Sequence, residues 1–418
     1  METIWSLRRT EELVSDPDVK ICSLVKDNAF TRTRSMGFED AVRFMLDMSH
    51  DALSHRLDKF YSQAKGGSPI SQPAFTKLRA NFDHTPFEII LRELVGEEYS
   101  GRHELPLWHG LHVLGIDGSY LQLPQEPDII KEFGVRGKEN KQGQARASAG
   151  ISVLYDVLHG WAIDPAIEHT NRSERTAAIH HIDFLAGELP YLTHNAVLLM
   201  DRGYPSYEIL EQCEENGLKF AIRCNSYVFK AANNCPLGST VLSLESGQIV
   251  RVVRFKLKSG ETETLLSNLF DLPESEFPAL YAMRWGVETY YHKLKEIVGV
   301  EQFSGRTPNS VRQDFWAALV MLLFAQMFQR DADAEIAKPQ EPLPVKYLNR
   351  ARTSHIVVTL RDRFIFSALC GYPKLATFEF RSVMDELARV VSPQRPGRSF
   401  PRNPKPAAAA NLLLKSRL

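Results

Sequence analysis

Two aspartates stand where buried β-strands are expected to end. Asp117 follows the apolar run LHVLGI and precedes Gly118, and Asp201 follows AVLLM and precedes Arg202-Gly203, a pair suited to a sharp exit. Carboxylates at strand ends are held rigidly over a crevice, which suits metal binding. Either aspartate by itself is more typical of a turn-capping residue. The metal interpretation therefore needs a third ligand elsewhere in the chain.

The segment YAMRWGVETYYHKLKEI supplies a candidate for that ligand. It lies in a long helix predicted from about 274 to 298, and its spaced polar residues are Tyr281, Arg284, Glu288 and Lys295. At about 100° per residue, these side chains fall within about 60° of one another on one helical face. Such a row is usually a solvated face. Phosphoryl transfer needs this mixture, however: carboxylates hold two divalent ions about 4 Å apart, and cations hold the phosphates.

The spacing of these four residues resembles the Y-R-E-K signature of DDE transposases in the IS-four family of bacterial insertion sequences. The DGS at Asp117 and the DRGY at Asp201 are similar to the motifs around that family's first two catalytic aspartates. The resemblance covers approximately residues 111–306. Three motifs in the correct order are more specific than any one of them.

The resemblance implies an RNase H-like catalytic domain, an α/β fold in which helices flank a mixed sheet, with a β-rich insertion before the glutamate. It also implies Mg²⁺ or Mn²⁺, two ions per active site, held by the catalytic residues Asp117, Asp201 and Glu288. One ion would activate water and then a terminal 3′-hydroxyl for in-line attack, and the other would stabilise the leaving oxygen. The phosphates of the transposon end would contact Tyr281, Arg284 and Lys295.

The elements that must position these residues can be read from hydrophobic patterns. Strands are expected to begin near Leu111 and to lie at 147–157, 160–167, 196–200 and 219–223, and helices are expected at 173–189 and 206–215. The order β-β-β-α-β-α-β predicts a mixed sheet flanked by helices. A strand-rich insertion is expected at about 224–270, with candidate strands at 249–256 and 262–267.

The two ends of the chain differ from this middle part, which we assign to residues 106–330. Residues 1–105 are expected to form a helical DNA-binding domain, because two helices, a glycine-containing turn and a short helix from Ser71 resemble a helix-turn-helix unit. Residues 331–418 are expected to be helical and basic, with a disordered tail from about 392. From Pro342 onward the chain has 14 Lys/Arg and 4 Asp/Glu, although the whole chain has a net charge of −1.

Further contacts with DNA are expected outside the signature. The segment from Lys131 to Arg146 carries five basic residues among several glycines, and we interpret it as a DNA-contacting loop. The basic candidates for DNA contact, including those of the short N-terminal helix and of the DRGY motif, are Lys77, Arg79, Arg136, Lys138, Lys141, Arg146 and Arg202.

Composition excludes several other classes of protein. The five cysteines lie far apart without the spacing of zinc ligands, and the start of the chain has no apolar signal-peptide core. The apolar run FWAALVMLLFAQMF is shorter than the roughly 20 residues that span a bilayer, so we interpret it as a buried helix. We therefore expect a cytoplasmic protein without a membrane partner. The glycines after Phe133 do not follow a nucleotide-loop pattern.

These observations predict a cut-and-paste transposase that binds double-stranded DNA at the terminal inverted repeats of its element and at the target. We expect a homodimer in the DNA complex, because two transposon ends must be joined. Three alternatives remain: a transposase-derived DNA-binding regulator, a nuclease of the same fold without strand transfer, and a glycosidase with paired carboxylates. Whether a DNA hairpin intermediate forms is left undecided, because the insertion lacks the tryptophan with which some relatives hold a flipped base.

Overall fold

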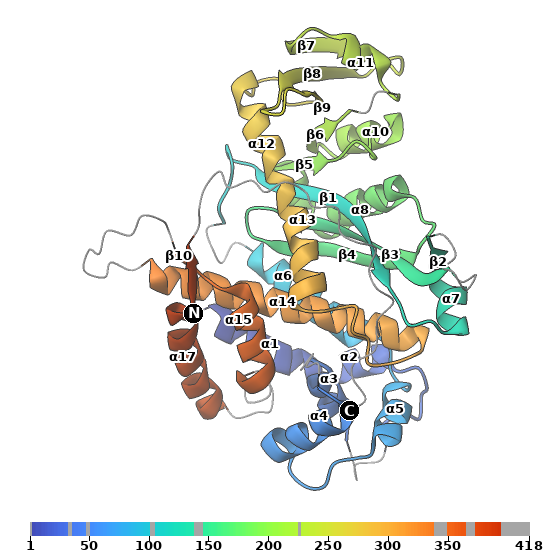
Figure 1. Ribbon diagram of the computed structural model, residues 1–418, viewed down its shortest axis with the longest axis vertical. Coiled ribbons are helices and arrows are strands. Elements are labelled where there is room, and N and C mark those ends of the chain that lie inside the picture. The colour runs from blue at the N-terminus through green and yellow to red at the C-terminus, as the bar shows by residue number, and fades with distance from the viewer. Residues whose placement is uncertain are drawn as a thin grey trace.

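The computed structural model describes residues 2–31, 36–46, 51–100, 105–137, 145–224, 227–337, 349–364 and 373–393. A large mixed β-sheet with helices packed against it forms one half of the molecule, and a cluster of helices forms the other half (Figure 1). A segmented helix runs from the outer strands of the sheet down to the helical cluster. The chain thus has the expected α/β sheet together with helical regions at both ends.

The first part of the sheet is antiparallel. It consists of β1 (His112–Gln122), β3 (Arg146–Asp156) and β4 (Trp161–His169). β3 lies between the other two, and the β3–β4 turn contains the expected His159-Gly160 pair. Most of the β3 side chains are buried, as expected for an inner strand with both faces covered. The strands predicted at 147–157 and 160–167 are confirmed.

Two further strands run parallel to β1. They are β5 (Ala196–Met200) and β6 (Lys219–Arg223), both apolar and largely buried. Parallel neighbours need crossover connections, and helices supply them here. The crossover helices are α8 (Glu174–Glu188), α9 (Pro190–Thr193) and α10 (Tyr207–Glu215). The predicted helices and strands of this part are therefore confirmed.

The strand-rich segment after β6 extends the same sheet. It contains α11 (Lys230–Asn234), β7 (Gly238–Ser243), β8 (Ile249–Lys256) and β9 (Thr262–Ser267). β9 pairs antiparallel with β6, and the strand order is β2-β3-β1-β5-β6-β9-β8-β7, with β4 beside β3. The two candidate strands of the insertion have the expected bounds. β7 was not predicted, because its residues alternate between half-buried and exposed positions at the sheet edge.

The helix expected at about 274–298 is present but divided, and we call residues 274–297 the helical arm. Its parts are η2 (Glu274–Glu276), α12 (Phe277–Met283), α13 (Trp285–His292) and the π-helix η3 (Lys293–Ile297). α13 lies directly on β1. A side chain at Gly115 would come within 2.6 Å of Val287, so the glycine allows this close approach.

The long helix α14 (Pro308–Ile336) runs through the helical cluster. Thr307 and Ser310 form a capping box at its start, and nearly every residue of its apolar run is buried. It packs against α1 (Glu2–Val14), α3 (Phe38–Leu46), α6 (Thr85–Glu98), α15 (Thr353–Thr359) and α17 (Pro373–Arg389). The buried-helix prediction is confirmed. The domain boundary expected at 330 falls within this helix.

Shorter elements complete the described chain. They are α2 (Pro17–Ser23), α4 (Leu53–Phe60), η1 (Tyr61–Lys65), α5 (Gln72–Arg79), α7 (Pro127–Phe133), β2 (Val135–Arg136), β10 (Asn349–Ala351), η4 (Leu360–Phe364) and β11 (Val391–Pro393). Among the helices in the described ranges, none is long and apolar enough to cross a membrane.

The expected role of Arg79 in DNA contact is wrong. Arg79 lies at the end of α5, but its side chain is only 5% exposed and ion-pairs with Asp314 at 3.2 Å. Its guanidinium also donates hydrogen bonds to Gln313 (3.0 Å) and Ser304 (2.7 Å). Arg79 therefore fastens α5 to α14. Lys77, two residues earlier, is exposed and stays a candidate for DNA contact.

Candidate active site

The sheet brings Asp117 and Asp201 to adjacent positions. The parallel pairing of β1 with β5 ends at Ile116 and Met200, so Asp117 and Asp201 each directly follow the last paired residue. The expectation that Asp117 ends its strand is wrong. β1 continues to Gln122, because residues after Asp117 keep pairing with β3. The two carboxylates still meet at one edge, since it is β5 that stops there.

Each aspartate accepts a hydrogen bond from the backbone N–H of the residue that follows it. Asp117 Oδ1 accepts the N–H of Gly118 at 3.0 Å, and Asp201 Oδ1 accepts the N–H of Arg202 at 2.7 Å. The Tyr291 hydroxyl, from α13, donates to the carbonyl of Asp117 at 2.7 Å. These bonds fix the carboxylates while leaving Asp117 Oδ2 facing the helical arm.

Arg284 lies among the acidic residues. Its guanidinium is 3.6 Å from Asp117 Oδ2 and 2.9 Å from Glu288 Oε1. One helical turn earlier, the Tyr281 hydroxyl lies 3.4 Å from Asp201 Oδ1, and its ring is 5.8 Å from the guanidinium. The structure therefore places Tyr281, Arg284 and Glu288 beside the two aspartates. The helical arm is interrupted at Arg284, between α12 and α13, where it contacts the acidic residues.

Burial and mutual repulsion perturb these groups. Burial raises the pKa of Asp117 to about 6, with Glu288 and Asp201 acting in the same direction and Arg284 and the Gly118 N–H opposing it. Burial likewise raises the pKa of the Tyr281 hydroxyl. For Arg284 burial acts to lower the pKa, but the neighbouring Tyr281 and the aspartates raise it overall. The site thus concentrates negative charge in a poorly solvated position.

Lys295 lies on the same side of the arm but contacts β1 beyond the aspartate. Its ammonium donates hydrogen bonds to Ser119 Oγ at 2.7 Å and to the carbonyl of Tyr120 at 2.8 Å. Lys295 lies in the π-helix η3. Lys295 therefore links the end of the arm to β1 and keeps a positive charge two to three residues from Asp117.

Glu174 is a further acidic residue at this site that the sequence analysis missed. It begins α8, and a Cβ at Gly203 would lie 2.9 Å from Glu174 Oε2, while one at Gly118 would lie 3.5 Å from Oε1. Burial, then Asp117, Glu174 and Asp201, raise the pKa of the buried Tyr204 hydroxyl. No motif marks Glu174, because a glutamate in the first turn of a helix is common.

A buried hydrogen-bond network lies next to β1. His181 on α8 bonds Asp164 at 2.7 Å and Ser152 Oγ at 2.9 Å, and Ser152 lies opposite Gly118 in the sheet. Asp164 also pairs with Arg92 of α6 at 3.1 Å. The helical cluster, α8 and the sheet are thereby joined just behind the aspartates.

The remaining described candidates for DNA contact in this half of the molecule are Arg202 and the pair Arg136 and Arg146. Arg202 is exposed beside Asp201. Arg136 on β2 pairs in register with Arg146 on β3, and its guanidinium lies 3.3 Å from the centre of the Tyr120 ring. These two arginines thus flank the far end of β1. Two other candidates, Lys138 and Lys141, lie outside the described residues.

Comparison with known proteins identifies the family. Residues 108–324, just over half of the chain, match the family model described as "Transposase DDE domain". A 141-residue stretch is 27% identical to a probable transposase for insertion sequence element IS5377 from Geobacillus stearothermophilus, covering 30% of this chain and 37% of that protein. A 71-residue stretch is 32% identical to the putative transposase y4zB of Sinorhizobium fredii (strain NBRC 101917 / NGR234), covering 17% and 20%. The matches therefore span well under half the length of these relatives.

A solved structure supports the fold over nearly the whole chain. The piggyBac transposase, determined as a synaptic complex with hairpin DNA, aligns with 94% of this chain and 87% of its own, at a TM-score of 0.51 and 13% identity. This likeness confirms the expected α/β fold class, RNase H-like with a mixed sheet flanked by helices. Together with the family match over residues 108–324, it leads to one conclusion: the chain belongs to the transposase DDE domain family.

Proposed function

We propose that this protein is a cut-and-paste transposase of the IS-four type, which cleaves and joins DNA at the terminal inverted repeats of an insertion sequence. The catalytic residues are Asp117, Asp201 and Glu288. The observation that carries the proposal is that Arg284 lies between Asp117 and Glu288, while Tyr281, one helical turn earlier, contacts Asp201 in a chain of the transposase family. The spacing and contacts of Tyr281, Arg284, Glu288 and Lys295 support the Y-R-E-K assignment.

The donor set fits Mg²⁺ or Mn²⁺. Carboxylate oxygens are the ligands that these ions prefer. Burial, with a smaller contribution from Glu288 and Asp201, raises the pKa of Asp117, and a bound cation would offset this cost of ionising the carboxyl. The Tyr204 hydroxyl, buried near these carboxylates, has no hydrogen-bond partner among the described groups. In the described structure, no choice of one oxygen from each of the three carboxylates places all three atoms within 4.8 Å of one another. The Arg284 guanidinium lies between Asp117 and Glu288 and supplies the neutralising charge there.

The chain's own residues have distinct roles in this reaction. Divalent ions bound there would polarise the scissile phosphate and lower the pKa of the attacking hydroxyl. Tyr281 and Arg284 bind phosphate oxygens of the transposon end, because they combine a hydroxyl and a bidentate cation beside the carboxylates. Lys295 orients the end of the helical arm on β1 and attracts the DNA backbone.

The partner is double-stranded DNA, both as transposon ends and as target. Arg202, Lys77, Arg136 and Arg146 provide positive charge for backbone contacts, and the basic C-terminal region adds to it. The protein acts as a homodimer in the DNA complex, because joining two ends requires two active sites. It works in the bacterial cytoplasm, where the chromosome lies.

The test is cleavage and joining of DNA that carries the element's own ends. Asp117→Asn, Asp201→Asn and Glu288→Gln should each abolish Mg²⁺-dependent cleavage while binding of end DNA survives. Asp271→Asn, an exposed aspartate before the helical arm, is the matched control and should cleave normally. Retained metal-dependent cleavage in any of the three variants would refute the proposal.

The same assay separates the alternatives. A pre-cut 3′-hydroxyl end supplied with target DNA should be joined to it. Hydrolysis without joining would indicate a nuclease, and DNA binding without either reaction would indicate a transposase-derived regulator.

A further inference from the structure

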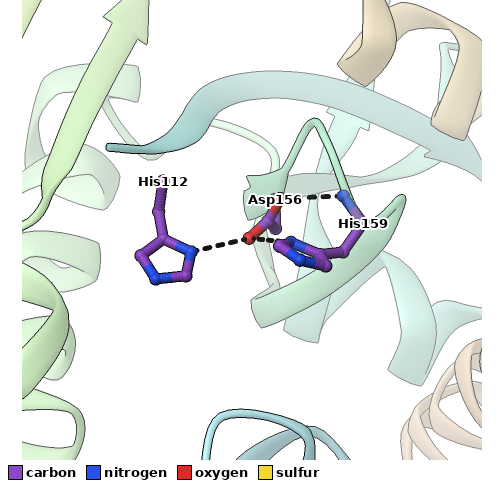
Figure 2. Close-up of side chains that lie close together, drawn as sticks. All are labelled: His112, Asp156 and His159. Atoms are coloured by element: carbon purple, nitrogen blue, oxygen red, sulfur yellow. Dashed lines mark hydrogen bonds and ion pairs between the residues drawn. The ribbon is translucent and has the colours of Figure 1, made fainter. Parts of the chain in front are cut away.

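A second cluster of potential metal ligands lies at the other end of β1. His112 begins β1, Asp156 ends β3, and His159 lies in the turn that follows (Figure 2). One ligand atom from each residue lies within 4.8 Å of the other two. Asp117 is five residues further along β1, about 16 Å away at 3.3 Å per residue. The cluster is therefore separate from the candidate active site.

The carboxylate of this cluster is fully buried and firmly oriented. Asp156 Oδ1 accepts the backbone N–H groups of Leu158 and His159, both at 3.0 Å. Its Oδ2 accepts a hydrogen bond of 2.7 Å from the Tyr99 hydroxyl, which in turn accepts one from Trp161 Nε1 at 3.3 Å. Partners of this kind orient a carboxylate ligand and hold it in place.

The two imidazoles are less well explained by hydrogen bonding. The His159 side chain is 3% exposed and stacks on the Trp161 ring, and neither ring nitrogen has a hydrogen-bond partner in the described structure. Its Nδ1 lies 2.6 Å from Asp156 Oδ2, but without hydrogen-bond geometry. His112 Nδ1 is also buried without a partner, 3.9 Å from the same oxygen.

We propose that His112, Asp156 and His159 form a structural site for Zn²⁺. Two imidazoles and a carboxylate suit zinc better than Mg²⁺, which prefers oxygen ligands. At Zn–ligand distances of about 2.0–2.2 Å, a tetrahedral site places its ligand atoms about 3.3–3.6 Å apart. The observed separations of 2.6 and 3.9 Å lie on either side of that range, so small side-chain rotations bring the atoms to it.

An ion pair between His159 and Asp156 is the simpler interpretation of the same contact. It leaves the buried Nδ1 of His112 3.9 Å from Asp156 Oδ2, beyond hydrogen-bond distance, and does not explain why a second imidazole is there. A bound cation accounts for both imidazoles. The zinc would join the start of β1 to the β3–β4 turn and, through Tyr99, to the end of α6. This inference does not depend on the proposed reaction.

The experiment measures metal binding in the full chain carrying Asp117→Asn, which weakens the candidate active site. The protein is stripped with a chelator and titrated with Co²⁺, whose visible absorption reports tetrahedral nitrogen ligation, and Zn²⁺ is then used to displace it. We expect one tightly bound ion per chain and a higher melting temperature with zinc. His112→Gln and His159→Gln should lose both effects, and the neighbouring His109→Gln, on an exposed side chain, should keep them.

Tyr99→Phe retains all three ligands and tests the buried support. It should weaken zinc binding by about 10–100-fold, the usual effect of removing an outer hydrogen bond from a metal ligand. If a histidine variant does not fold, X-ray absorption spectroscopy of the zinc-loaded Asp117→Asn parent identifies the ligands instead. We expect two imidazoles and one carboxylate. The proposal is overturned if the parent binds no zinc, if His112→Gln and His159→Gln bind it unchanged, or if the ligand shell contains only oxygen.

Discussion

Replacing Asp117 by asparagine is expected to stabilise the metal-free protein at neutral pH. The Asp117 side chain is 21% exposed and shares its surroundings with Asp201 and Glu288, and burial raises its pKa from 3.8 to about 6. Ionisation therefore costs more in the folded chain than in the unfolded chain. Asparagine has nearly the same shape and no charge, so it avoids this cost.

The magnitude follows from the pKa shift. Each pKa unit corresponds to 1.36 kcal/mol, so ionised Asp117 destabilises the fold by about 3 kcal/mol at pH 7 and above. Because the folded pKa is the higher one, the protonated carboxyl contributes full stability below about pH 4, and this contribution is lost as the pH rises through about 6. The advantage of the asparagine variant should therefore be absent at pH 4 and nearly complete at pH 7.

Urea unfolding at a series of pH values, with a chelator present, measures this difference. Asp271→Asn, which removes a charge from an exposed position, should give no comparable gain. Adding Mg²⁺ should raise the unfolding free energy of the wild type more than that of Asp117→Asn, because a bound cation offsets the cost of ionising Asp117 in the folded protein. Equal or lower stability of Asp117→Asn at pH 7, or a gain that persists unchanged at pH 4, would refute the reasoning.

Three further substitutions test individual contacts. Glu174→Gln should slow cleavage by about 10–100-fold without weakening DNA binding, because its carboxylate lies beside the aspartates; an unchanged rate would exclude a role. Arg79→Met should lower the unfolding free energy by about 3–5 kcal/mol by separating a buried ion pair, whereas exposed Lys77→Met should change it by less than about 0.5 kcal/mol. Trp285→Ala should weaken binding of end DNA by about 1–3 kcal/mol if this 58% exposed ring stacks on a base, and unchanged affinity would exclude stacking.

Local patterns predicted most of the sheet. The strands β8 and β9 have the expected bounds, because both lie between turn residues and β8 is rich in β-branched apolar residues. The edge strand β7 was missed because its half-buried alternation gives a weak signal. The end of β1 was misplaced because Asp117 and Gly118 are typical turn residues, and only pairing with β3 shows that the strand continues.

The candidate site was predicted through spacing, and its surroundings were not. Helical periodicity placed Tyr281, Arg284 and Glu288 on one face, and the fold brings that face to the aspartates. Contacts between distant segments left no local trace in the sequence. Glu174 reaches the site because α8 crosses the sheet, and Arg79 is buried because α5 packs on α14. The sequence analysis had placed Arg79 on the surface from its residue type alone.

We propose that Asp117, Asp201 and Glu288 hold the catalytic cations. An anomalous difference map of crystals of the full chain with end DNA and Mn²⁺ tests this proposal. We expect Mn²⁺ peaks bounded by these three carboxylates, with the guanidinium of Arg284 moved from between Asp117 and Glu288 onto a phosphate. Well-ordered DNA at the site with Mn²⁺ bound elsewhere, and Arg284 still paired with both carboxylates, would contradict it.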